Sequence, residues 1–165
     1  MEILFSVNGM KIKPFETINL ISTLEVYKQC EDFLSLGPVP YASMEMVQTD
    51  IDNSVNSKGI FCCIWNESEK QIGVLDFIPE VEIGIAFLDL LMISKQYRYN
   101  GIGTSIVKEL AVYLKEKYHT KIIKSGVQTN NSIGINFWKK NGFILESIPK
   151  DMNDGTVAFQ MKKTI

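Results

Sequence analysis

The feature that most constrains the fold is the junction between an apolar segment and an amphipathic helix near residue 100. Residues 83–93 are nearly all apolar, which is typical of a strand buried on both faces of a sheet. Ile102, Ile106 and Leu110 then begin a repeat of one apolar residue in four, which predicts a helix over about 101–118. A strand buried on both sides needs other elements to cover it, so the junction favours an α/β domain.

The rest of the chain alternates between strands and helices. Asn8-Gly9 is the strongest short hairpin signal and separates strands predicted at 2–7 and 10–15. Helical spacing predicts a helix over about 19–35, with Ser22 and Glu25 as a capping box. The remaining predictions are a helix at about 43–56, strands at 59–66, 71–78 and 121–128, a helix at 131–140 that ends at Asn141-Gly142, and a closing hairpin of strands at 143–149 and 155–162.

Length and composition limit the class of protein. The 165 residues predict one domain spanning 1–165, to which the strand at 2–7 is a short N-terminal addition. Lysine and arginine number 17 and aspartate and glutamate 19, and this net charge of −2 argues against a partner that is nucleic acid or a membrane surface. Residues 83–93 are too few to span a bilayer, and the first residues lack the features of a signal peptide.

The cysteines indicate a reducing compartment. Cys30, Cys62 and Cys63 are odd in number, and two of them are adjacent, which suits neither a disulfide framework nor a zinc site. We therefore expect three reduced thiols, no bound metal and a cytoplasmic location.

The junction also carries the chemical signal, because Gly101 and Gly103 lie where the helix begins. A helix N-terminus has unpaired N–H groups and a partial positive charge, and glycines there let a phosphate come close to the backbone. The spacing is neither a Walker motif nor a full dinucleotide fingerprint. Taken alone, the glycines leave two interpretations open: a structural turn or a phosphate cradle.

A wider pattern narrows the choice. Arg98-x-x-Gly101-x-Gly103 after a buried strand resembles the acetyl-CoA pyrophosphate motif of the GNAT acetyltransferase superfamily. Residues 131–143 resemble the second signature of that family, Asn-x-x-Ala-x-x-x-Tyr-x-x-x-Gly-Phe, and they follow at the expected separation. The resemblance implies an α/β fold of GNAT type, a twisted, mostly antiparallel mixed sheet with helices on both faces.

The resemblance also implies a co-substrate, acetyl-CoA, and a way of holding it. The strand at 84–93 would splay from its neighbour, and its last residues would bind the pantetheine arm through their backbone, with the Ile93 N–H near the thioester carbonyl. The N–H groups from Arg98 to Thr104 would hold the pyrophosphate. The cofactor-binding residues implied are Leu91, Met92, Ile93, Arg98, Asn100, Gly101, Ile102, Gly103, Thr104, Asn131 and Trp138.

The sequence departs from the family pattern at four positions, of which Lys95, where a proline is common, is a minor change. Asn100 stands where glycine or a basic residue is frequent, and it could cap the helix instead. Gly134 replaces the usual alanine. Trp138 stands where many members carry a tyrosine proposed to protonate the leaving thiolate, and an indole N–H is not a practical acid. Trp138 would therefore pack against the cofactor arm or serve as a core aromatic residue.

The resemblance implies an N-acetyltransferase that works by direct attack of an amine in a ternary complex. The general base is predicted to be Asp89, with Glu82 second, because alternation places residues 87, 89 and 91 on one face and Asp89 is costly in so apolar a strand. The alternative is that Asp89 is paired structurally and water is the base. His119, at the far end of the long helix, is expected to be structural.

The acceptor is the least constrained part of the interpretation. A primary amine of a small molecule or peptide fits the reaction, and the loop at 36–42, with Tyr41 and Met44 nearby, is the expected wall of its site. Dimers are common in the family, so a homodimer is suggested, although no apolar stripe identifies an interface. Two other functions stay open: a non-catalytic acyl-CoA-binding or regulatory module, and a protein that binds a different nucleotide.

Overall fold

The protein is described by a computed structural model that covers residues 2–165. One nine-stranded sheet has the order β1-β2-β3-β4-β5-β6-β9-β7, and β8 pairs with β9. Every pair of neighbours is antiparallel except β5 and β6. The strands are β1 Phe5–Val7, β2 Met10–Pro14, β3 Ile60–Trp65, β4 Gln71–Glu82, β5 Ile85–Ile93, β6 Ile122–Gln128, β7 Ile144–Leu145, β8 Lys150–Asp151 and β9 Val157–Thr164.

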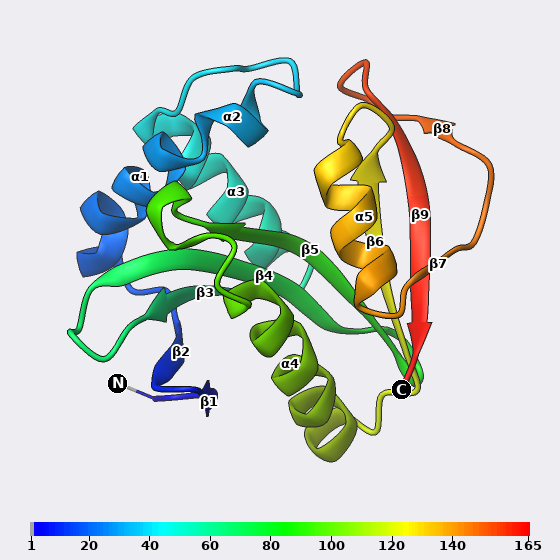
Figure 1. Ribbon diagram of the computed structural model, residues 1–165, viewed down its shortest axis with the longest axis horizontal. Helices are drawn as coiled ribbons and strands as arrows, with labels where there is room; N and C mark the ends of the chain where they lie inside the picture. The colour runs from blue at the N-terminus through cyan, green and yellow to red at the C-terminus, as the bar shows by residue number, and fades with distance from the viewer. Residues whose placement is uncertain (1) are drawn as a thin grey trace.

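Helices cover both faces of this sheet, as the sequence predicts (Figure 1). The α-helices are α1 Leu20–Gln29, α2 Glu31–Leu34, α3 Met44–Asn56, α4 Ile102–Tyr118 and α5 Ser132–Lys140, and two short 3-10 helices span Thr17–Asn19 and Lys95–Tyr97. Buried residues of α4 and α5 belong to one hydrophobic cluster, and those of α1 and α3 belong to a second. The predicted mixed α/β fold is confirmed, and the two clusters place α4 and α5 on one face and α1 to α3 on the other.

Most local predictions are confirmed. Asn8 and Gly9 both have positive φ, 50° and 78°, as a tight turn between antiparallel strands requires, and β1 and β2 pair around them. Strand β1 begins only at Phe5. Gly142 ends α5 with a φ of 87°, the expected left-handed cap.

The predicted helix over 19–35 is wrong in its middle. Cys30 leaves the helical region, at φ −112° and ψ 19°, and separates α1 from the single turn of α2. Ser22 is not an N-cap either, since its Oγ lies inside α1 and donates to the Oε1 of Gln71 on β4. The helix is therefore fixed to the sheet by a tertiary contact that local spacing does not reveal.

The C-terminal hairpin also differs from prediction. The strand expected at 143–149 is reduced to the two residues of β7, the two residues of β8 follow it, and the second strand lies at Val157–Thr164. Strand β9 pairs along β6 over seven residues, from Ile122–Thr164 to Gln128–Ala158. The long ladder with β6 provides hydrogen-bond partners for one edge of β9, and β7 and β8 pair with its other edge over two residues each.

The remaining whole-chain expectations concern cysteines and membranes. Cys30, Cys62 and Cys63 are free and buried. Among residues 2–165, no helix is long and apolar enough to cross a membrane, and no cluster of His, Cys, Asp or Glu is arranged to hold a metal ion.

Candidate active site

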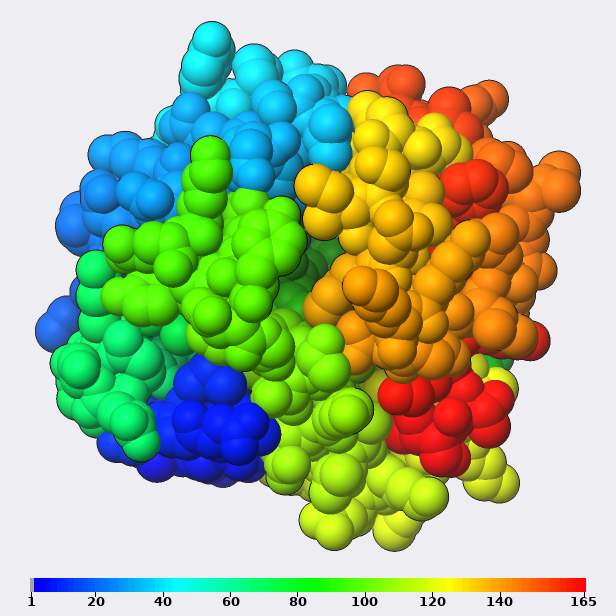
Figure 2. Space-filling view, in the orientation of Figure 1, coloured from blue at the N-terminus to red at the C-terminus, as the bar shows by residue number. Residues whose placement is uncertain are grey.

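The site begins where β5 and β6 separate. Their parallel pairing runs from Ile85 and Ile122 to Leu88 and Ser125, and the Ser125 Oγ donates to the Leu88 carbonyl at 2.9 Å. Beyond Leu88, β5 stays with β4 while β6 follows β9. The predicted splay is therefore present. Figure 1 shows the two strands diverging, and Figure 2 shows a hollow between the green segment near residue 100 and the orange-yellow α5.

The splay exposes one backbone edge of β5. Ser94 donates its N–H to Ile72 of β4, and N–H groups alternate in direction along a strand. The N–H groups of Ile93 and Leu91 therefore point away from β4, to the side that β6 has left. The Ile93 carbonyl on that side already accepts from Arg98, but the two N–H groups remain for a ligand.

A bulge at Asp89 changes which side chains share a face. Leu90 pairs with Asp76 and Leu88 with Phe77, so Asp89 is an extra residue without a partner on β4. Leu88 and Leu91 consequently contact the same cluster as α4, whereas Leu90 contacts the other. The prediction that residues 87, 89 and 91 share a face is thus wrong for Leu91.

The same region corrects the expectation of a strand buried throughout. Phe87, Leu91 and Ile93 are half-buried and Asp89 is exposed, because no strand or helix covers β5 where β6 has departed. Met92 lies on the other side of the strand and is buried against α1 and α3.

The predicted cradle lies beside this edge, at the start of α4. Tyr99 and Gly101 have positive φ, 64° and 74°, and alternate with residues of ordinary conformation. Successive N–H groups in such an arrangement form a concave anion-binding nest. Within residues 2–165 the N–H groups from Tyr99 to Thr104 find no protein acceptor, and Ser105 is the first to bond back, to the Gly101 carbonyl.

Space above these donors is open. A Cβ built on Gly101 meets nothing within 4 Å, whereas one on Gly103 comes within 3.1 Å of the Phe137 ring. Gly101 therefore leaves room for a phosphate and holds a left-handed backbone, and Gly103 allows α5 to pack close to α4. Ile102, between them, contacts the core with its side chain.

Three predicted cradle residues behave differently from expectation. The Arg98 N–H is used within the chain, donating to Lys95 at 3.3 Å, so it does not join the nest. Asn100 does not cap α4, because the N-cap is Gly101 and the Asn100 amide only approaches the Tyr97 carbonyl at 3.5 Å. The Thr104 hydroxyl accepts from Asn141 at 3.3 Å, which ties α4 to the end of α5.

The predicted base lies at the fork itself, on the face of α1 and α3. The Asp89 side chain reaches solvent, but the protein around its carboxyl removes part of the hydration of the charged form and so raises its pKa. Two other carboxylates lie near enough to repel it: Asp76, which accepts from the Ser54 hydroxyl at 2.6 Å, and Asp50, which accepts from the Tyr27 hydroxyl at 2.7 Å. No lysine or arginine within residues 2–165 forms a salt bridge with any of the three.

Burial dominates the titration of this group of acids. It raises the pKa of Asp76 to about 6, with Asp89 and Asp50 adding repulsion, and it raises the pKa of Asp50 against the opposing Tyr27 bond. Glu82, the second candidate base, lies at the β4–β5 hairpin, where it pairs with Ile85 at the far end of β5. The structure therefore separates Glu82 from the fork and keeps Asp89 there.

Helix α5 supplies the last two predicted cofactor residues, and both have structural roles. Asn131 is the N-cap of α5, accepting from the Gly134 N–H at 2.8 Å, and a Cβ on Gly134 would lie 2.5 Å from the Asn131 amide nitrogen. Gly134 thus permits this cap conformation. Trp138 is buried, with Phe137 and Phe143 each at 5.0 Å between ring centroids, so it is a core residue, as one alternative expected.

Two cavities are lined in part by residues of the predicted site. The first, of about 390 Å³, lies between the loop after α2, the β6–α5 loop and the β8–β9 loop. Leu36, Gly37 and Pro38 form its wall on the α2 side. The 36–42 loop thus lines a cavity through its first residues, whereas Tyr41 and Met44 are exposed and do not line it. Asn130 bridges the two walls by donating to the Leu36 carbonyl at 3.1 Å.

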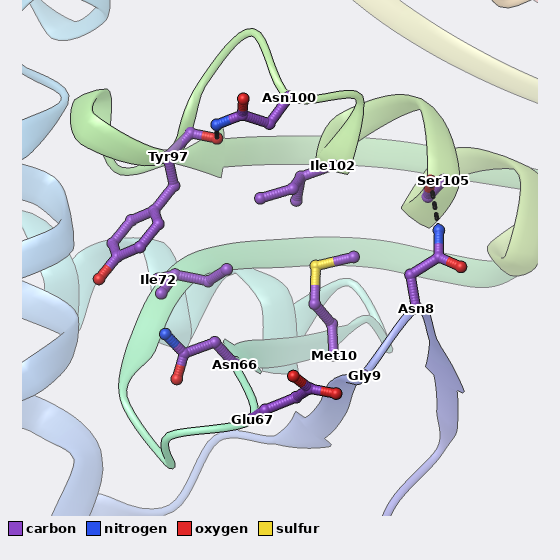
Figure 3. A pocket seen from close by; sticks show the side chains of 10 residues that line it. All are labelled: Asn8, Gly9, Met10, Asn66, Glu67, Ile72, Tyr97, Asn100, Ile102 and Ser105. Atoms are coloured by element: carbon purple, nitrogen blue, oxygen red, sulfur yellow. Dashed lines mark hydrogen bonds between the residues drawn. The ribbon is translucent and has the colours of Figure 1, made fainter.

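The other cavity, of about 280 Å³, lies on the α4 side (Figure 3). Asn100 and Ile102 form one wall, and the turns at Asn8 and Asn66 form the others. His119 is exposed at the opposite end of α4, remote from the cradle, which agrees with a structural role.

Comparison with known proteins decides the family. Residues 25–143 match the model of the acetyltransferase (GNAT) family. The chain belongs to this family. As a GNAT acetyltransferase it is an acyltransferase, and its co-substrate is acetyl-CoA. The nest and the open strand edge fit that group: unpaired N–H groups suit a pyrophosphate, and the β5 edge suits an extended amide-containing arm.

Solved structures support the fold. The chain is similar to an acetyltransferase from Salmonella typhimurium that modifies the N-terminal serine of ribosomal protein L7/L12 (13% identity, 99% of each chain, TM-score 0.82). It is also similar to spermidine N-acetyltransferase from Vibrio cholerae in complex with CoA and spermine (12%, 96% of each chain, 0.75). A third is PaiA N-acetyltransferase from Thermoplasma acidophilum in complex with coenzyme A (20%, 94% of this chain and 99% of that one, 0.69). No curated protein matches the sequence.

Sequence reasoning missed four residues around the fork. Asp50 and Tyr27 lie on separate helices and meet only in the folded chain. Cys30 likewise meets Ile93, and Asp32 meets Arg98, only in the folded chain. Asp50 is the one of the four with a local signal, because it lies beside Val47 and Ile51 on the packed side of α3, whereas Asp32 is exposed and its sequence position carries no such signal.

Proposed function

We propose that this acetyltransferase transfers the acetyl group of acetyl-CoA to a primary amine of a small molecule or peptide, by direct attack in a ternary complex. The observation that carries the proposal is the fork between β5 and β6. Unpaired N–H donors lie on its α4 side, and an exposed carboxylate lies on its α1 and α3 side. A gap through the sheet with this asymmetry suits two substrates that approach from opposite faces.

The donor would be held by backbone groups. The N–H groups from Tyr99 to Thr104 bind the pyrophosphate, and the outward N–H groups of Leu91 and Ile93 bind the pantetheine arm and the thioester carbonyl. A fixed N–H at that carbonyl stabilises the oxygen as charge develops on it during attack.

Asp89 would accept the proton of the amine. The amine nitrogen attacks the carbonyl carbon, the C–S bond breaks, and coenzyme A leaves as the thiolate. Partial burial raises the pKa of Asp89, which makes the carboxylate a better base near neutral pH. Trp138 is buried and supplies no acid, so the thiolate takes its proton from water.

The acceptor would enter by the cavity at Leu36–Pro38 and Asn130. The acetyltransferases of similar fold act on spermidine and on a protein N-terminal serine, so both amine classes belong in the first panel. We further infer a single N-acetyltransferase domain over 1–165, a cytoplasmic location consistent with three free thiols, and a homodimer as in many relatives.

Calorimetric titration with acetyl-CoA, with ATP and NAD as competitors, tests the donor side. We expect selective binding of acetyl-CoA that Gly101→Glu abolishes, since the variant puts bulk and negative charge in the open space over the nest. Equal binding of ATP would favour a different nucleotide ligand and refute the assignment.

Thiol release across an amine panel tests the acceptor side. The panel should contain spermidine and a serine-initiated peptide, and Asp89→Asn serves as the matched variant. Binding of acetyl-CoA without turnover on any amine would favour the alternative, a non-catalytic acyl-CoA-binding module.

A further inference from the structure

The side chain of Arg98 does not face the phosphate cradle. Its Nε donates to the Ile93 carbonyl at 2.8 Å, and its two terminal nitrogens donate to the carboxylate of Asp32, at 2.5 and 3.0 Å. Such a bidentate pair is directional as well as strong. The contact with Asp32 raises the pKa of the guanidinium and lowers the pKa of the Asp32 carboxyl, so both groups are charged at neutral pH.

Asp32 lies on α2, and a second contact joins the same helix to β5. The Cys30 thiol, fully buried at the break between α1 and α2, approaches the Ile93 carbonyl at 3.4 Å. Burial raises the pKa of this thiol, which keeps it protonated and able to donate. The Ile93 carbonyl thus receives one donor from the cradle loop and one from the start of α2.

Two consequences follow for the substrates. Two donors hold the Ile93 carbonyl, and so they hold the end of β5, where the Ile93 N–H lies on the same side of the strand. The single turn of α2 is also fixed, and the chain after it, Leu36 to Pro38, forms a wall of the cavity where the acceptor would enter. Without this anchor α2 is too short to hold itself in place.

We propose that Arg98 is a positioning residue: its ion pair with Asp32 fixes the acceptor-side wall to the cofactor strand, and it is not a phosphate ligand. The proposal rests on the proposed function. The Arg98 guanidinium is neutralised by Asp32 and donates to the Ile93 carbonyl. The N–H groups of the nest offer a phosphate enough donors without the Arg98 side chain.

The test uses Arg98→Lys and Asp32→Asn, each in the full-length protein. Lysine keeps the charge but loses the bidentate geometry, and asparagine keeps the shape but loses the charge. Glu25→Gln is the matched control, because it breaks an exposed Lys28–Glu25 ion pair of 3.1 Å on neighbouring α1. Three readouts are acetyl-CoA affinity, steady-state kinetics with spermidine or the serine-initiated peptide, and the rate at which N-ethylmaleimide alkylates Cys30.

We expect both variants to bind acetyl-CoA within about threefold of wild type and with the same salt dependence. The KM for the amine should rise, or kcat/KM fall, by at least about tenfold, since small misplacements cost that much or more. Cys30 should be alkylated at least about tenfold faster because α2 opens more often. The double variant should be no worse than either single one.

A loss of acetyl-CoA affinity of tenfold or more in Arg98→Lys would make Arg98 a phosphate ligand and overturn the proposal. Unchanged alkylation of Cys30 in both variants would also overturn it, by showing that the ion pair does not hold α2. The alkylation result does not depend on any substrate. If wild type fails to bind acetyl-CoA, the proposed function fails, while Cys30 still reports on the anchor.

Discussion

Replacing Asp76 by asparagine should stabilise the protein at neutral pH. Asp76 is 3% exposed and has a hydroxyl partner in Ser54 but no cation, and burial raises the pKa of its carboxyl from 3.8 to about 6. At about 1.4 kcal/mol per pKa unit, the charged form costs the folded state about 3 kcal/mol. Asparagine removes that charge and can still accept the Ser54 hydrogen bond.

The net gain should be smaller than the full cost. The new amide N–H₂ group lies in a buried place, and an unsatisfied donor costs about 1–2 kcal/mol. We therefore expect Asp76→Asn to gain about 1–2 kcal/mol at pH 8, or about 3–6 °C in melting temperature.

The pH dependence gives the sharper signature. Because the folded-state pKa of Asp76 is raised, the folded state holds a proton that the unfolded state has released between pH 4 and 6. This contribution to stability is present below about pH 4 and is lost as pH rises through about 6. The advantage of Asp76→Asn should therefore be absent at pH 4 and complete by pH 7.

Urea unfolding of both proteins at pH 4, 5, 6, 7 and 8 measures this difference. The pKa of Asp50 and that of Asp89 are raised as well, so both proteins share that trend, and their difference reports Asp76 together with its repulsion of these two carboxylates. Glu116→Gln, at an exposed position on α4, is the control and should show no pH-dependent gain. A constant difference across the series, or a loss of stability at pH 8, would refute the reasoning.

Three further predictions concern the site. In wild type, kcat/KM should rise with pH along a pKa above the ordinary aspartate value. In Asp89→Asn this rise should disappear, and the rate should fall about 100-fold. A variant that keeps the pH profile would show that water is the base. Asn131→Asp keeps the N-cap acceptor but loses the amide donor, whereas Asn131→Ala loses both. The alanine variant should lose about 1 kcal/mol of stability and the aspartate variant should not, while a fall in acetyl-CoA affinity in both would confirm a cofactor contact. Trp138→Tyr should leave turnover and acetyl-CoA affinity unchanged, because the ring is packed between Phe137 and Phe143; an increase in turnover would show that the position faces the leaving thiolate after all.

Features set by neighbours in the chain could be predicted from the sequence. The Asn8-Gly9 turn and the repeat of α4 depend on local conformation and spacing, and the glycine-containing start of α4 combines both. Position in a sheet is different. The bulge at Asp89 arises because two adjacent residues of β4, Asp76 and Phe77, pair with Leu90 and Leu88. Nothing in the β5 sequence alone marks this pairing.

Contacts between distant segments were equally hidden. Arg98 and Asp32 are 66 residues apart, and the motif in which Arg98 lies suggested a phosphate rather than a carboxylate. The break of the first long helix at Cys30 has the same origin, since that thiol is buried against β5. In both cases tertiary packing overrode a correct local pattern.

The bulge and the fork act on the same few residues, and together they separate two kinds of chemistry. Had the alternation of β5 continued, Leu91 would share the face of Asp89, and the carboxylate would lie over the strand segment that binds the donor. The extra residue leaves Leu91 and Ile93 with the α4 cluster and Asp89 near Asp50 and Asp76 under α3. We infer that a negatively charged cofactor and a cluster of carboxylates can coexist at one gap because the sheet lies between them. The gap itself connects the two faces, and we infer that an amine that has lost its proton to Asp89 meets the thioester there.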